Sequence, residues 1–341
     1  MALSLAVKYR PKTFEDVTEQ GEVKKILEWQ IANNDIKGAY LFVGGAGTGK
    51  TTSARIFANE INHGQGNPTE LDAASNNGVD DVREIEKQAR MKSLTSEYKV
   101  FILDEVHMFS QSAWNAMLKL LEEPPQKTVF IMCTTDPQKI PKTILSRVQR
   151  YQFNRISQRG IVNRLMHICD IELREEDGLV RLEALEYIAK VADGHMRDAI
   201  TTLDKCLAYS HEITLGNVVK AIGATDYETM VRLTKALLDG NALDMITIVD
   251  KIHNEGKDFK FFIRSYLSFM LDVCTYGVAK NFDFIKIPNF YEADLAFICA
   301  IRNHSDLLSM LMKLNSEIKY DTEPKMLAQA YFYQFCKEQN E

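Results

Sequence analysis

A glycine-rich loop that ends in lysine and threonine has the clearest chemical potential in this chain. Residues 44–51, GGAGTGKT, fit the pattern GxxxxGK[ST] at every fixed position. The apolar segment 40–43 before the loop is typical of a buried parallel strand, and the segment 52–60 after it contains good helix formers. Glycines let backbone N–H groups turn towards a phosphate at the positive end of the new helix. We therefore expect a nucleotide-phosphate site rather than a plain glycine-rich turn.

The lysine and the threonine have separate tasks in such a site. Lys50 supplies a positive charge that reaches the β- and γ-phosphates, and the Thr51 hydroxyl holds Mg²⁺. The residues expected around the phosphates are Gly44, Gly45, Ala46, Gly47, Thr48, Gly49, Lys50, Thr51 and Thr52.

An acidic pair follows about fifty residues later. The apolar segment 100–103 ends in Asp104 and Glu105, as a central parallel strand would with carboxylates at its carboxyl end. Ligands bind at that end in open α/β sheets. We expect Asp104 to support the Mg²⁺ shell and Glu105 to polarise the attacking water. A strand that ends in a solvated acidic turn is the alternative, which the preceding phosphate loop disfavours.

Further strands and helices must position these residues. Apolar segment 128–133 predicts another strand, and a polar residue at its tip, in Thr134-Thr135, can touch the γ-phosphate or its water. The other strands expected are 70–72 and, at an edge, 151–153. Helices are predicted over 22–32, with Val23, Ile26, Leu27 and Ile31 on one face, over 79–92 and over 112–122, whose apolar stripe indicates core packing. Strands that alternate with helices predict an α/β fold with a parallel sheet.

Composition limits the class of protein. The 341 residues suffice for two or three domains, and no apolar run is long enough for a membrane span. The six cysteines are scattered without a CxxC pair, which favours reduced thiols in a cytoplasmic protein and argues against a zinc site. A net charge of −6 argues against a uniformly basic nucleic-acid binder but is compatible with a local basic surface.

Two segments have a local basic character. Between Pro137 and Cys169 the chain has seven basic residues and no acid, so these groups either form a solvated face or meet nucleotide or DNA phosphates across an interface. Near the amino terminus, Tyr9, Arg10 and Pro11 form either a surface turn or a wrapping for the base side of a nucleotide.

Beyond residue 160 the sequence predicts helices and no strands. Short helices are expected over 182–191 and 197–209, with the motif GHMRDA (194–199) between and within them. Longer amphipathic helices are expected over 242–252, 259–274 and around 307–318, with a last helix beginning near Pro324. These segments have no catalytic constellation and predict an all-helical assembly domain.

Together these motifs resemble the AAA+ ATPase subunits of bacterial clamp loaders, the gamma/tau subunits of DNA polymerase III, which are related to replication factor C. The resemblance covers nearly the whole chain and rests on KYRP (8–11), GGAGTGKT (44–51), LDAASNNGVDDVREI (71–85), FILDEVHM (101–108), NAMLKLLEEPP (115–125), TTDPQKIPKTILSR (134–147) and GHMRDA (194–199). It implies a five-stranded ATPase domain (1–158), a helical lid (159–222) and a helical collar (223–341). It also implies a pentameric ring with other clamp-loader subunits that opens a sliding clamp and places it on primer–template DNA.

The resemblance also implies roles for single residues. Lys50 and Thr51 become the ligands of ATP and Mg²⁺, Asp104 and Glu105 the acidic pair, and Thr134 or Thr135 the polar sensor, with Thr135 favoured by counting back from ILSR (144–147). Arg147 resembles the finger that reaches the ATP of the neighbouring subunit, and such a charge in trans is worth about 10³ to 10⁵ in rate. Arg197 resembles the lid arginine that senses the γ-phosphate in its own subunit.

Three departures from the family pattern stand out. Val148 replaces the cysteine of a Ser-Arg-Cys motif, which affects packing rather than catalysis. Segment 59–71 is short and has no cysteine, so the four-cysteine zinc module of bacterial members is not expected. The chain ends at Glu341, where the collar should end, so we do not expect the polymerase- and helicase-binding domains of long forms.

Two other functions remain open at this point. A different AAA+ motor, for branch migration or replication restart, would share the ATP site and act on DNA without a clamp. A non-hydrolysing scaffold, like the stator subunit of the same ring, would not need the intact Lys50-Thr51 and Asp104-Glu105 pairs.

Overall fold

The computed structural model describes residues 3–91, 96–173, 178–222, 226–301 and 303–340. The chain folds as two compact units, Met1–Thr214 and Leu215–Glu341, each with its own core. The division into an ATPase domain, a lid and a collar at 158/159 and 222/223 stays a prediction, and residue 223 lies outside the described residues.

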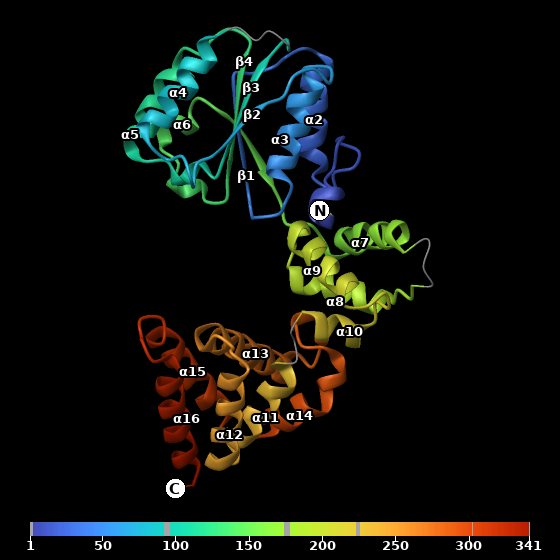
Figure 1. Ribbon diagram of the computed structural model, residues 1–341, viewed down its shortest axis with the longest axis vertical. Helices are drawn as coiled ribbons and strands as arrows, with labels where there is room; N and C mark the ends of the chain where they lie inside the picture. The colour runs from blue at the N-terminus through green and yellow to red at the C-terminus, as the bar shows by residue number, and fades with distance from the viewer. Residues whose placement is uncertain (1–2, 92–95, 174–177, 223–225, 302, 341) are drawn as a thin grey trace. The chain divides into compact units, whose positions relative to one another are not determined.

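The first unit contains a five-stranded parallel sheet (Figure 1). Its strands are β1 (Ala39–Gly44), β2 (Thr69–Asp72), β3 (Lys99–Asp104), β4 (Thr128–Thr134) and β5 (Gln149–Phe153), in the spatial order β2-β3-β4-β1-β5. Every neighbouring pair is parallel, with Leu103 of β3 and Leu41 of β1 both opposite Met132 of β4. The carboxyl ends of β3, β4 and β1 therefore meet at one edge of the sheet. The predicted five-stranded α/β fold is confirmed.

Helices cover both faces of this sheet, as Figure 1 shows. On one face, Leu41 and Phe130 pack with α4 (Val79–Arg90), α5 (Gln111–Glu122) and α6 (Lys142–Leu145). On the other face, Phe42 and Ile131 pack with α2 (Gly21–Ala32) and α3 (Lys50–Glu60). Alternate residues of the central strands point to opposite, equally covered faces. This is why those strands are continuous apolar runs in the sequence.

The predicted helices exist, with differences at their edges. α4 ends at Arg90, and Lys92, the last residue of the prediction, lies outside the described part of the chain. In α2, Val23 and Leu27 are buried, but Ile26, which was predicted to share a face with them, is 46% exposed. The buried face of a surface helix covers only part of its circumference, so some apolar residues near its edge stay exposed.

The four remaining described α-helices of the first unit pack against one another. α7 (Gln158–Glu172) packs against α8 (Leu182–Ala192) and α9 (Met196–Tyr209), and the short helix α1 (Leu5–Lys8) packs on α9. Ser157 begins α7 by accepting a hydrogen bond from the Gly160 N–H at 3.1 Å. This group follows β5 directly and therefore lies close to the sheet edge where β1 ends.

The second unit has only helices among its described residues. These are α10 (Leu215–Ala221), α11 (Asp226–Leu238), α12 (Ala242–Asn254), α13 (Phe259–Ala279), α14 (Glu292–Ala300), α15 (His304–Glu317) and α16 (Pro324–Asn340), with 3₁₀ turns at Phe282–Phe284 and Asn289–Tyr291. At its centre the buried Tyr266 hydroxyl lies 2.8 Å from Thr234 Oγ1. Nowhere in the described residues is there a helix with the length and apolar character that crossing a membrane requires.

Candidate functional site

The phosphate loop connects β1 to α3 at the carboxyl edge of the sheet. Its first glycine is required by packing, because a Cβ at Gly44 would lie 2.4 Å from the Phe153 carbonyl oxygen on β5. Gly47 has a φ of +65°, and a Cβ there would lie 3.3 Å from the backbone nitrogen of Arg197. The Thr48 hydroxyl closes the loop by donating to the Gly45 carbonyl at 2.9 Å. The backbone is therefore held as a tight turn at the amino end of α3.

Lys50 is buried inside this turn. Its Nζ donates to the Gly44 carbonyl at 2.9 Å and to the Gly45 carbonyl at 2.8 Å, and the residue is only 5% exposed. Burial lowers the pKa of Lys50, while the nearby carboxylates of Glu105 and Asp104 favour the charged form. An ammonium group held by two neutral carbonyls has a strong preference for an anionic partner, and a phosphate oxygen is such a partner.

The hydroxyl and carboxylate predicted to hold Mg²⁺ face each other. Thr51 Oγ1 donates to Asp104 Oδ2 at 2.7 Å across the gap between α3 and β3. A hydroxyl and a carboxylate are oxygen ligands, and Mg²⁺ is usually held by one or two protein oxygens together with waters and phosphates. The donor set therefore fits Mg²⁺. No group of three or more His, Cys, Asp or Glu side chains that could enclose a metal occurs among the described residues. The expected absence of zinc stays a prediction.

Glu105 lies next to the tip of β4. Its Oε2 accepts hydrogen bonds from the Thr135 hydroxyl at 2.9 Å and the Thr135 N–H at 3.2 Å. The neighbouring Thr134 is fully buried, and its hydroxyl oxygen lies 3.2 Å from His107 Nδ1. Of the two threonines at this tip, Thr135 is therefore the one in contact with Glu105. Sequence reasoning did not identify His107, although it lies only two residues beyond Glu105.

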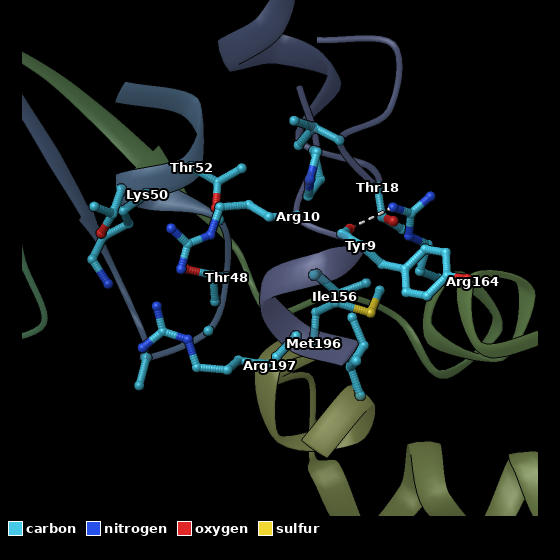
Figure 2. A pocket seen from close by; sticks show the side chains of 18 of the residues that line it. Tyr9, Arg10, Thr18, Thr48, Lys50, Thr52, Ile156, Arg164, Met196 and Arg197 are labelled. Carbon is cyan, nitrogen blue, oxygen red and sulfur yellow. Dashed lines mark hydrogen bonds between the residues drawn. The ribbon is translucent and has the colours of Figure 1, made fainter. Parts of the chain in front are cut away.

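A pocket beside the loop contains the remaining predicted nucleotide-binding residues. Its lining includes Tyr9, Arg10, Pro11, Thr52 and Arg197, together with residues 46–51 of the phosphate loop and both acids. In Figure 2 the Arg10 and Arg197 side chains extend towards the side of the pocket where Thr48 and Lys50 lie. The structure thus brings together the predicted loop, acidic and arginine residues from separate stretches of the chain, with Arg147 as the exception.

Helix α9 rests directly on the phosphate loop. The Met196 N–H, at the first residue of the helix, donates to the Gly47 carbonyl at 3.1 Å. Arg197 is the next residue of the helix and lines the pocket. Any movement of α9 therefore moves Arg197 relative to the phosphate site.

Several polar contacts around the pocket join residues far apart in the sequence. The Tyr9 hydroxyl donates to Glu172, and Lys8 Nζ lies 2.7 Å from Glu172 Oε1. Arg164 Nη2 donates to the Tyr9 carbonyl at 2.7 Å, as Figure 2 shows. The hydrogen bonds from Lys8 and Tyr9 lower the pKa of Glu172. The amino-terminal segment is thereby fastened to α7.

Gln20 is a second residue that sequence reasoning missed. It is 8% exposed, with a left-handed backbone (φ +52°). Its amide donates to the Asn154 carbonyl at 2.7 Å and to the Thr48 carbonyl at 3.4 Å, and its Oε1 accepts from the Asn154 N–H at 3.1 Å. Gln20 therefore links the phosphate loop to the end of β5. A buried, non-glycine residue at positive φ has no signal in a single sequence.

Arg147 lies away from this pocket. Its Nη2 is 2.6 Å from Glu122 Oε1, and its Nη1 donates to the Thr143 carbonyl at 2.8 Å. It borders a hollow with Lys37, Ala39 and Gln149, at the amino ends of β1 and β5. The phosphate loop lies at the opposite end of β1, so Arg147 lies away from the phosphate site of its own chain.

Comparison with solved structures defines the class of fold. The chain is similar to a structure titled Thermotoga maritima RuvB Holliday junction branch migration motor, with a TM-score of 0.53 over 73% of this chain and 86% of that one. A structure of a single-residue mutant of that protein gives the same TM-score. The identities are 19% and 18%, so the likeness shows the fold alone. The parallel sheet, its phosphate loop and this likeness define an AAA+ ATPase fold.

Sequence comparisons identify the family within that class. A family model described as DNA polymerase III, delta subunit, matches residues 69–157, and one described as DNA polymerase III subunits gamma and tau domain III matches residues 213–336. The chain is 34% identical to DNA polymerase III subunit gamma of Buchnera aphidicola subsp. Schizaphis graminum, over 83% of this chain and 84% of that protein. The chain belongs to the family of DNA polymerase III gamma and tau subunits.

Longer relatives extend beyond the matched region. The chain is 34% identical to DNA polymerase III subunit tau of Bacillus subtilis over 96% of its own length, and 36% identical to DNA polymerase III subunit tau/gamma of Haemophilus influenzae over 75%. It spans 62% and 40% of these two proteins.

Proposed function

We propose that this chain is an ATPase subunit of a sliding-clamp loader. ATP binding drives opening of the clamp and binding of primer–template DNA, and hydrolysis to ADP and phosphate releases the closed clamp on DNA. Membership of the DNA polymerase III gamma/tau family supports the proposal. The observation that carries the ATPase part is the contact of Thr51 Oγ1 with Asp104 Oδ2 at 2.7 Å, with Lys50 and Glu105 beside them.

The residues divide the chemistry of ATP hydrolysis among them. Lys50 exchanges the Gly44 and Gly45 carbonyls for phosphate oxygens and stabilises charge that develops on the β- and γ-phosphates. Thr51 and Asp104 would hold Mg²⁺, which would supply positive charge to neutralise the phosphates. Glu105 orients the attacking water and accepts its proton. It is available for this task because the other carboxylate at this edge, Asp104, is the one assigned to Mg²⁺.

Two polar groups report the state of the γ-phosphate. Thr135 has one hydroxyl proton, which in this structure goes to Glu105, and a γ-phosphate oxygen competes for it. Arg197 is attracted by the same charge, and it moves with α9 because it is the second residue of that helix. In this proposal residues 1–158 are the ATPase domain, 159–222 the lid that responds, and 223–341 the collar.

The partners follow from the same proposal. The collar assembles with other clamp-loader subunits into a pentameric ring, Arg147 reaches the ATP of a neighbouring subunit, and the acid-free basic segment 137–169 faces phosphates. The position of Arg147 at the far end of β1 from its own phosphate loop supports a role in trans.

An ATPase assay with purified sliding clamp and primer–template DNA tests the function. We expect the rate to rise strongly only with clamp and DNA together. A rate that rises fully with DNA alone would favour a DNA motor, and no hydrolysis under any condition, at the level of a Lys50→Ala control, would favour a scaffold.

A further inference from the structure

The turn that follows β3 brings a histidine to the side of Glu105. Glu105 has a left-handed backbone (φ +48°) and begins the 3₁₀ turn η1 (Val106–Met108). The Met108 N–H donates to the Glu105 carbonyl at 2.9 Å and closes the turn. The closed turn places the His107 imidazole on the same side as the Glu105 carboxylate.

His107 contacts the carboxylate directly. Its Nδ1 lies 3.2 Å from Glu105 Oε2, and its side chain is 13% exposed. The same Nδ1 lies 3.2 Å from the hydroxyl oxygen of Thr134, which is fully buried and accepts a hydrogen bond from the Asp136 N–H at 3.1 Å. With its hydrogen on Nδ1, the imidazole can share that hydrogen between Glu105 Oε2 and Thr134 Oγ1, which both lie 3.2 Å away.

The hydrogen bonds to Glu105 are concentrated on one oxygen. Oε2 accepts from the Thr135 N–H and the Thr135 hydroxyl, and His107 Nδ1 lies 3.2 Å from the same oxygen. Within the described part of the chain no hydrogen bond to Oε1 occurs. Anchoring Oε2 fixes the plane of the carboxylate and leaves Oε1 for the attacking water.

We propose that His107 is the positioning residue that holds Glu105 in its catalytic orientation when Thr135 turns to the γ-phosphate. The proposal rests on the proposed ATPase function. The Thr135 hydroxyl has a single proton and cannot donate to Glu105 and to a phosphate oxygen together. His107 stays beside Oε2, because the contact of Nδ1 with Thr134 holds the ring in place and Thr134 does not line the pocket. The carboxylate then retains the orientation that the water needs.

A pair of substitutions separates this role from packing. His107→Asn keeps an N–H donor close to the position of Nδ1, whereas His107→Leu fills similar space without a donor. We expect kcat for ATP to fall about tenfold or more in the Leu variant, with KM little changed, because leucine has no donor for the charged carboxylate. The Asn variant should recover most of the loss. The measurement uses the full chain, under the condition that gives wild type its highest rate.

A double-mutant cycle shows whether His107 acts through Glu105. If His107 acts through Glu105, adding His107→Leu to the Glu105→Gln variant should change the residual rate by less than about twofold. A change of that size is within the usual error of such additivity comparisons. A Leu variant as fast as wild type, an Asn variant as slow as Leu, or an equal loss in both backgrounds would overturn the proposal.

A replacement variant and the activity of wild type complete the test. If the Leu variant fails to fold, as judged by its thermal melt, His107→Gln replaces it, because its amide lies one bond further out and cannot reach Oε2 and Thr134 in the same way. An active Asn with a slow Gln variant supports the proposal, and equal rates overturn it. If wild type itself does not hydrolyse ATP, the proposed function fails rather than the role of His107.

Discussion

Replacing Arg147 with alanine should stop ATP hydrolysis in the assembled ring while leaving ATP binding to the same subunit nearly unchanged. In its own chain Arg147 lies among residues at the amino ends of β1 and β5, away from the phosphate loop. Its loss therefore removes nothing from its own pocket. An arginine that reaches a neighbour's γ-phosphate is worth about 10³ to 10⁵ in rate.

The intramolecular alternative predicts a much smaller effect. Arg147 pairs with Glu122 at 2.6 Å, and the side chains are 36% and 44% exposed. An ion pair this open to water contributes about 0.2 to 1 kcal/mol to the free energy of unfolding. A loss of that size shifts the melting temperature by no more than about 2 to 4 °C in a domain of this size and does not slow hydrolysis a thousandfold.

Glu122→Gln is the matched control, because it breaks the same ion pair and keeps Arg147. We expect its melting temperature to change as in Arg147→Ala and its hydrolysis rate to stay near wild type. If both variants lose the same activity, the ion pair, not a finger, explains the loss.

Mixed rings give the direct test of action in trans. Arg147→Ala subunits have an intact Lys50, and Lys50→Ala subunits have an intact Arg147, so together they can complete a site between them. The readout is ATPase activity stimulated by clamp and primer–template DNA. If mixed rings form and no mixture recovers activity, the trans role is refuted.

The other predictions concern the acidic pair, the phosphate loop and the buried thiols. Lys50→Ala should abolish ATP binding and turnover with the fold intact, since Lys50 is the lysine at the phosphate loop; near-normal nucleotide binding by calorimetry would contradict the site. Glu105→Gln should bind ATP but hydrolyse it slowly, because Asp104 and Thr51 still hold Mg²⁺; weak binding with unchanged turnover per bound ATP would refute these roles. Burial raises the pKa of the Cys169 thiol to about 12 and that of Cys206 to about 11, from an ordinary 9.0. Above pH 9.0 the unfolded chain therefore loses protons that the folded chain keeps, and the free energy of unfolding falls as pH rises. Urea melts up to about pH 10 should show a shallower fall when both cysteines are alanine, and an equal slope would exclude this cause.

Much of the fold and the centre of the site could be predicted from local sequence. Strands covered on both faces need continuous apolar runs, which is why 40–43, 100–103 and 128–133 could be recognised. Phosphate binding needs glycines, a lysine and a hydroxyl at fixed spacing, so Lys50 and Thr51 were identifiable without coordinates. Each of these signals comes from physical requirements within a few neighbouring residues.

Local patterns were less reliable where packing decides between similar residues. Ile26 and Leu27 are adjacent apolar residues of one helix, yet Leu27 is fully buried and Ile26 is 46% exposed. The sequence shows the period of the stripe, but the width of the buried face depends on what packs against it.

The polar contacts that complete the site were decided by the tertiary structure. Gln20 bonds to Thr48 and Asn154, Tyr9 bonds to Glu172, and Arg147 pairs with Glu122, although each pair is far apart in the sequence. A single polar side chain has no periodicity, and its partner depends on where the sheet and helices place two distant segments. Even His107, two residues from Glu105, acquires its contact only because a left-handed turn and the tip of β4 bring Thr134, His107 and Glu105 together. The sequence alone therefore determined which groups can bind a nucleotide, whereas the tertiary structure decided which neighbours orient them, since hydrogen bonds depend on distances that only the packed chain defines.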